Sequence, residues 1–155
     1  MSGEESEILL LLRLMGWSLY YEPQLKIQHF MTSNRLNWRY YLRLRRSLGA
    51  TSVYLELYKA MIHTIVNGGR PTHKSWRKEL SATIKEILKD PPALFAGLLN
   101  THQGNYRITR INFQIGRFNE QLKLGKKIDE IYSNLFEKYV SIQNTCKLSK
   151  RDMEN

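Results

Sequence analysis

The sequence has little of what usually cross-links or anchors a chain. Its 155 residues include one cysteine and four prolines. Cys146 can form no internal disulfide, which fits a reducing compartment and leaves an intermolecular bond or a free thiol open. The only markedly apolar run, 8–15, is too short to span a membrane, and acidic residues precede it, so it is not a signal peptide either. We therefore expect a cytoplasmic chain that could also lie at a membrane surface.

Signatures of a complete active site are also missing. The sequence has no Ser-His-Asp order, no phosphate-binding loop, no glycine-rich dinucleotide fingerprint and no cysteine pair. No histidine has a second His, Asp or Cys at the spacing of metal ligands, so we do not expect this chain to bind a metal alone. The four histidines are His29, His63, His73 and His102.

Positive charge is what the sequence has in excess. Twenty-four Lys and Arg residues stand against fourteen Asp and Glu, a formal net charge of +10. Such a charge favours anionic partners, which include nucleic acid, phosphorylated ligands and an acidic membrane face. One helix face would carry four arginines, Arg35, Arg39, Arg43 and Arg46. This face could bind phosphate oxygens, or it could simply be solvated.

Hydrophobic periodicity predicts a mainly α fold. Apolar residues recur every three or four positions through most of the chain, with breaks at glycine and proline. The clearest break is Asn-Gly-Gly-Arg-Pro at 67–71. Before position 100 we expect helices over 4–15, 35–48, 53–66, 75–89 and 93–99, with Gly49 separating the second from the third.

The segment between the first two predicted helices has a different composition. Positions 17–21 and 25–30 are rich in residues that suit strands, and Glu22-Pro23 between them marks a turn. We therefore expect a small two-strand β element. Alternation along the second strand puts His29 on the face that should be buried. Two strands and one helix make a poor independent layer, so we interpret them as the edge of something larger.

The last third of the chain has the longest apolar period. It runs from Ile108 to Ile142 and is interrupted at Gly125. Two packed antiparallel helices, or one long helix with a weak point at the glycine, would each produce this pattern. A polar tail follows from Lys147, and we expect it to fray.

Three carboxylates open the first predicted helix: Glu4, Glu5 and Glu7. Carboxylates at a helix start compensate the positive end of the helix dipole, which is the simpler interpretation. A carboxylate in such a cluster could also serve as a general base. The periodicity alone favours the simpler interpretation.

A series of short motifs fills the start of the chain. Gly-Glu-Glu-Ser-Glu-Ile at 3–8 is followed by Arg-Leu-Met-Gly-Trp at 13–17, Leu-Tyr-Tyr-Glu-Pro at 19–23 and His29. In order and spacing this series resembles the end of the catalytic domain of family 2 glycosyltransferases. Looser similarity to bacterial members that make extracellular polysaccharide continues at 34–40, 49–53, 104–106 and 116–118.

The resemblance implies roles for several residues. The family's acidic pair supplies the base that deprotonates the acceptor hydroxyl, and Glu4 and Glu5 match this pair. The family usually has Asp at the position of Glu5, and the side chain of Asp is shorter than that of Glu by one methylene. His29 matches a histidine that in some members binds a metal or the diphosphate. The residues expected near the acceptor or the diphosphate are Arg35, Trp38 and Arg39.

The same resemblance implies a further part. Family members begin with a nucleotide-binding α/β half whose Asp-x-Asp motif holds a divalent metal, Mg or Mn, on the diphosphate. This sequence has no Asp-x-Asp and no such segment ahead of Met1. We therefore expect the C-terminal part of an inverting glycosyltransferase of polysaccharide biosynthesis, inactive alone. Nucleotide-sugar, glycan acceptor and metal would be bound only in the complete enzyme.

In this interpretation 1–33 ends the catalytic domain, 34–146 is a helical C-terminal extension and 147–155 is a flexible tail. The β element would then be a remnant of the α/β domain. Two alternatives stay open. A basic helical module could bind an acidic membrane surface, a protein partner or, less favourably, nucleic acid. The apolar period over 108–142 could instead serve self-association.

Overall fold

The computed structural model describes residues 4–66, 75–99 and 103–153. These residues form six α-helices and one short 3₁₀ helix, so the predicted mainly α fold is confirmed. In chain order the elements are α1 (Glu4–Leu14), η1 (Ser33–Arg35), α2 (Trp38–Val66), α3 (Trp76–Leu88), α4 (Pro91–Leu98), α5 (Tyr106–Leu124) and α6 (Lys127–Met153). The predicted break at 67–71, and with it Gly3, His73 and His102, lies outside the described residues.

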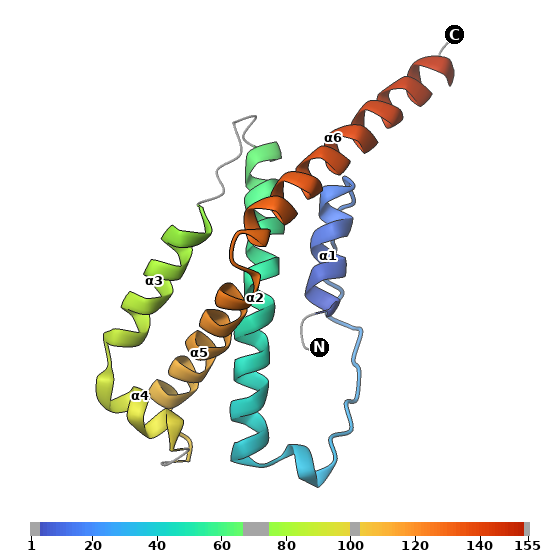
Figure 1. Cartoon of the computed structure of the whole chain (residues 1–155). Helices are drawn as coiled ribbons and strands as arrows, with labels where there is room; N and C mark the ends of the chain where they lie inside the picture. Colours follow the sequence, from blue (N-terminus) through green and yellow to red (C-terminus); the bar gives the residue numbers. More distant parts are fainter. Residues whose placement is uncertain (1–3, 67–74, 100–102, 154–155) are drawn as a thin grey trace.

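α2 is the longest helix, with 29 residues, and it is the centre of the structure. In Figure 1 the other helices lie on either side of it. Asn37 caps its first turn, because its Oδ1 accepts a hydrogen bond of 2.8 Å from the Tyr40 amide. The prediction of two helices separated at Gly49 is wrong, since α2 continues through this glycine without a break.

Gly49 is needed for packing and does not end the helix. A Cβ added at Gly49 would lie 1.9 Å from the carbonyl oxygen of Phe113 in α5. A Cβ added at Gly116 would lie 1.9 Å from the carbonyl oxygen of Arg46 in α2. Each glycine stands three residues after the carbonyl that the other glycine faces, so the contact is reciprocal. The two backbones therefore approach as closely as only glycine permits.

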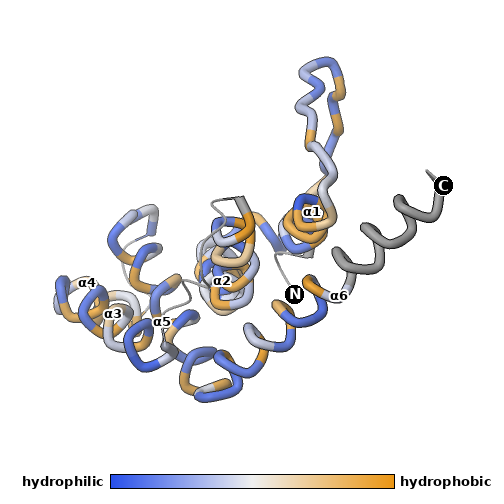
Figure 2. The backbone as a smooth tube through the Cα atoms, turned by 90° about the horizontal axis from the view of Figure 1, so that it is seen from above, coloured by the Kyte–Doolittle hydropathy of each residue, from blue (hydrophilic) through white to orange (hydrophobic). Residues whose placement is uncertain are grey.

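The predicted two-strand β element is not found. Within 17–32 the backbone is extended with one turn at 23–24, and no residue of the described chain is assigned to a strand. The turn has a hydrogen bond of 3.2 Å from the Leu25 amide to the Glu22 carbonyl. An isolated hairpin is marginal in water, and this one has no further strand or helix face beneath it. Figure 2 shows the connection between α1 and α2 as a loop that stands out from the helices.

The main core joins three helices that are far apart in the sequence. Its buried residues are Leu14 of α1, Val53, Leu57, Tyr58 and Met61 of α2, and Ile128 and Tyr132 of α6. The first turns of α6 therefore pack on α2 and α1. Further buried apolar residues are Leu42 of α2, Ala93 of α4, and Ile108 and Ile111 of α5.

The long apolar period of the last third is divided at Gly125, as expected. Gly125 has a φ of 50°, in the region that favours glycine, and separates α5 from α6. Figure 1 shows α6 continuing away from α5, so the two are not an antiparallel pair. α6 runs through Met153, although the sequence predicted a frayed tail from Lys147.

α3 and α4 begin and end within two residues of their predicted positions. Asp90 caps α4 by accepting a hydrogen bond of 3.2 Å from the Ala93 amide. Pro91 and Pro92 occupy the first positions of α4, where the missing amide hydrogen costs nothing. None of the described helices combines the length and the apolar composition needed to cross a membrane.

Candidate functional site

The acidic cluster lies at the start of α1. Glu5 is exposed, whereas Glu7 is half-buried against α2. The Oε1 atom of Glu7 accepts a hydrogen bond of 2.8 Å from the Tyr58 hydroxyl. The structure thus divides the cluster into one exposed carboxylate that can meet a ligand and one that α2 holds. The side chain of Glu4 is outside the described part of the chain.

Two tyrosines of α2 donate to carboxylates of neighbouring helices. Tyr54 makes the same contact as Tyr58, donating to Oε1 of Glu120 in α5 over 2.8 Å. Burial, together with the hydrogen bond to Glu7 and its charge, raises the pKa of Tyr58 to about 12. Burial and the bonded Glu120 likewise raise the pKa of Tyr54 to about 12. Both phenols therefore remain neutral donors throughout the physiological range.

The raised pKa values of these two tyrosines predict that the folded protein loses stability in alkali. Each phenol has a folded pKa of about 12 against 10.0 when unperturbed, so the folded state binds more protons between these values. The contribution of each phenol to the free energy of unfolding is fully present below pH 10. It falls by about 2 kcal/mol for each tyrosine as the pH rises towards 12. Urea unfolding at pH 9 and pH 11.5 measures it. The Tyr54→Phe, Tyr58→Phe double variant should lose clearly less stability than the wild type, and equal losses would contradict the prediction.

A hollow of about 580 Å³ lies beside the first turn of α2. It brings together two residues singled out in the sequence, Arg35 and Trp38. The complete lining is Met31, Arg35, Leu36, Asn37, Trp38, Tyr41, Gln103 and Gly104. The rings of Trp38 and Tyr41 are 5.8 Å apart and tilted by 31°. Aromatic faces beside a guanidinium and two amides suit a ligand with an apolar ring face and many oxygens.

The indole N–H of Trp38 is a separate feature, because it is not open to the hollow. Its Nε1 is buried and has no hydrogen-bond partner within the described chain. Buried indole N–H groups usually have a partner, so an acceptor is expected nearby. The sequence offered Tyr41, with Trp38 and Tyr40, as stacking surface for a base or a sugar ring or as core residues. Gln103 was missed, because only the fold brings it close to Trp38.

The four predicted arginines do not form one continuous face. Arg35 lies in η1, while Arg39 and Arg43 are exposed on α2. Arg46 turns towards α5, where its Nε donates a hydrogen bond of 2.6 Å to Asn112 Oδ1. Arg46 is therefore part of the contact between α2 and α5, because Gly49 and Gly116 bring the two helices close together at this point.

His29 is exposed, so its predicted burial on a strand face is wrong. Without a second layer, alternation along the extended segment has no buried side to specify. Among the described residues, no three His, Cys, Asp or Glu side chains lie close enough to hold a metal ion. The metal role implied for His29 therefore finds no further ligand in the described part of this chain.

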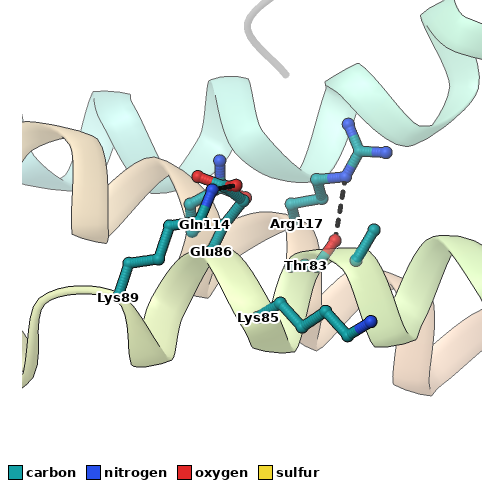
Figure 3. Close-up of a pocket in the computed structure, with 7 residues that line it drawn as sticks. Thr83, Lys85, Glu86, Lys89, Gln114 and Arg117 are labelled. Carbon is teal, nitrogen blue, oxygen red and sulfur yellow. Dashed lines mark hydrogen bonds and ion pairs between the residues drawn. The ribbon is translucent and has the colours of Figure 1, made fainter.

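A second hollow, of about 340 Å³, lies between α3 and α5. Figure 3 shows Lys85 and Glu86 of α3, with Lys89 just after its end, along one side and Gln114 and Arg117 of α5 along the other. Lys89 is paired with Glu86. Arg117 donates to Thr83 Oγ1 over 3.2 Å, and its guanidinium is occupied by carboxylates outside the hollow. Arg117, the most buried cation that lines this hollow, is thus already neutralised. The hollow is therefore poorly suited to an anionic ligand.

Arg117 links three helices. Its Nη2 lies 2.5 Å from Glu56 Oε2 in α2 and 2.9 Å from Glu79 Oε2 in α3, and its Nη1 also pairs with Glu56. Burial disfavours the charge, but hydrogen bonds and charges from the two glutamates outweigh this and raise the pKa of Arg117. These contacts make Arg117 a structural residue of the bundle.

The predicted site residues thus fall into separate groups, and Glu5, His29 and Arg39 are not among those lining the hollow of Arg35 and Trp38. Comparisons with protein-family models, curated proteins and solved structures find no match for the chain. The resemblance to family 2 glycosyltransferases therefore rests on the sequence motifs.

Proposed function

We propose that this chain is the C-terminal part of an inverting glycosyltransferase of polysaccharide biosynthesis. It works together with an α/β half that binds the nucleotide-sugar, on the same or another polypeptide. The observation that carries the proposal is a set of exposed apolar side chains in the N-terminal part of the chain, here called the N-terminal apolar surface: Ile8, Met15, Trp17, Leu25, Ile27 and Phe30. These side chains are between 57% and 92% exposed.

The N-terminal apolar surface is suited to an α/β partner. Large contiguous apolar surfaces on soluble proteins usually mark an interaction site. Ile8 belongs to α1, Met15 follows the last residue of this helix, and the other four side chains belong to 17–32, a segment of strand-like composition that forms no strand within the described chain. Such a segment can add to the sheet edge of another unit. A sheet edge on the nucleotide-binding half would cover both features.

In the proposed reaction, Glu5 accepts the proton of the acceptor hydroxyl as its oxygen attacks the anomeric carbon. The bond from that carbon to the diphosphate breaks on the opposite face. The nucleoside diphosphate leaves with the bonding electrons, and the configuration inverts. The hollow of Arg35, Trp38 and Tyr41 supports a sugar or diphosphate contact, because it pairs aromatic faces with a guanidinium.

A basic module that binds phosphates along α2 is less well supported. Arg39 and Arg43 are exposed as that function needs, but Arg46 is bonded to Asn112 and the stripe is interrupted. Steeply salt-dependent binding to duplex DNA or to anionic vesicles would favour this module over the transferase.

Reading the DNA next to the Met1 codon in all three forward frames is the first test. We expect it to encode a βαβ pattern with Asp-x-Asp, because the proposed reaction needs groups that activate the donor. That half and this chain, produced together, should form a complex and transfer sugar from a nucleotide-sugar. Unrelated adjoining sequence would exclude a half on the same polypeptide and leave only one encoded elsewhere. Transfer by this chain alone would contradict the proposal.

Variants of the N-terminal apolar surface sharpen the test. Phe30→Asp places a charge where the side chain is 92% exposed, so the isolated chain should fold normally while the complex is lost. Leu88→Asp is the matched control, because Leu88 is 62% exposed but lies on α3. It should leave the complex intact. A complex that tolerates Phe30→Asp as well as Leu88→Asp would mean that this surface is not the docking site.

A further inference from the structure

α1 contacts the rest of the structure through a narrow stripe. Glu7, Leu10 and Leu14 recur at helical spacing on the side that meets α2 and α6. Leu14 is buried in the main core, and Leu10 packs against it. Other faces of α1 are open, since Ile8 is 57% and Leu9 47% exposed. This stripe therefore sets how α1 is rotated about its axis.

The polar end of the stripe depends on one described hydrogen bond. Tyr58 is 8% exposed, and its hydroxyl reaches Glu7 Oε1 over 2.8 Å. Glu7 lies two turns before Leu14, so the hydrogen bond and the core contact hold α1 at points about 10 Å apart. A helix held only at Leu10 and Leu14 could swing at its start, where Glu5 lies.

We propose that Tyr58 is a positioning residue, which holds α1 through Glu7 so that Glu5 is presented in one fixed orientation. This inference rests on the proposed function, in which Glu5 is the base. A catalytic base must be held to within about 0.5 Å of its productive place. The helical extension would thus contribute to the transfer step through α2, in addition to covering the core.

Tyr54 provides a matched control for Tyr58. It is a tyrosine of the same helix that donates over the same 2.8 Å to a glutamate, but this glutamate, Glu120, belongs to α5. Tyr58→Phe and Tyr54→Phe each remove one hydroxyl and one charge-assisted hydrogen bond. A loss of overall stability should therefore be similar in both, while a loss of α1 position should occur in Tyr58→Phe alone.

Hydrogen exchange of the full chain tests the positioning directly. In Tyr58→Phe the amides of 10–14 should exchange about tenfold faster than in the wild type, because α1 has lost its polar contact. In Tyr54→Phe they should stay within about twofold. Glu7→Gln, which keeps an oxygen acceptor for Tyr58, should retain most of the protection that Glu7→Ala loses. Unchanged exchange in Tyr58→Phe, or equal acceleration in Tyr54→Phe, would overturn the inference.

The transfer assay of the complex separates this inference from the proposed function. Tyr58→Phe should lower kcat about tenfold with an unchanged KM for the nucleotide-sugar, and Tyr54→Phe should leave kcat unchanged. If the wild-type complex transfers sugar and Tyr58→Phe is equally fast, the positioning role fails while the proposed function stands. If the wild-type complex transfers nothing, the proposed function fails, whatever the exchange experiment shows about α1.

Discussion

Replacing Gly116 with alanine is expected to destabilise the protein by at least about 3 kcal/mol. The new Cβ would lie 1.9 Å from the Arg46 carbonyl oxygen, and the obstacle is helix backbone that cannot rotate away. α2 and α5 would have to separate, which would open the packing around buried side chains such as Leu42 and Ile111. Gly49→Ala should act in the same way through the Phe113 carbonyl. Urea unfolding followed by helical circular dichroism measures both.

The sign of this effect makes the experiment decisive. Alanine in place of glycine inside a helix ordinarily gains about 1 kcal/mol, because alanine has the higher helix propensity. Gly97→Ala in α4 is the control, since its Cβ would meet only side chains, the nearest being Ile111 Cγ2 at 3.3 Å. It should have a small effect. Stability of Gly116→Ala equal to or above the wild type would show that the helices do not cross as closely as described.

The two glycines should also be coupled. Once Gly49→Ala has forced α2 and α5 apart, Gly116→Ala has less contact left to disrupt. The double variant should therefore cost clearly less than the sum of the single variants, as expected for residues that share one contact. Simple additivity would mean that the two positions do not belong to the same crossing.

Local signals in the sequence predicted the helices well where local rules decide. Asp90 with Pro91 and Pro92 begins α4, and Gly125 ends α5, because capping and a positive φ depend on neighbouring residues. Gly49 shows where such rules fail. A glycine inside an apolar helical pattern is compatible with a break and with a close helix crossing, and only α5 decides between them.

The same limit applies to the N-terminal segment and the candidate site. Strand-like composition at 17–30 indicates residues that suit a sheet, but a strand needs a neighbour, and the described chain provides none. The family resemblance grouped Arg35 with Trp38, and both line the hollow beside the first turn of α2. Sequence patterns could not reveal that Arg46 bonds Asn112, or that Tyr58 bonds Glu7, because these partners lie 66 and 51 residues apart.

Arg117 is the residue for which we expect the largest electrostatic effect. Its side chain is 13% exposed and lies between Glu56, 44% exposed, and Glu79, 26% exposed. Arg117→Met should cost about 3 kcal/mol at neutral pH, because it leaves two carboxylates close together without their cation. This value is at the lower end of the range for breaking a buried pair, since water reaches Glu56 and screens its charge. Urea unfolding at pH 7 measures the loss.

Two further variants show whether the stability lost in Arg117→Met comes from its ion pairs or from its packing. Arg117→Met combined with Glu56→Gln and Glu79→Gln should recover most of the stability, because no uncompensated charge remains and methionine keeps the aliphatic contacts. Arg107→Met, also in α5, removes a two-point contact to Asp90 from an arginine that is 62% exposed, and should cost much less. If the triple variant is no more stable than Arg117→Met, packing of the arginine stem explains the loss. If it recovers, the contacts of Arg117 with α2 and α3 hold α3 in the bundle by charge.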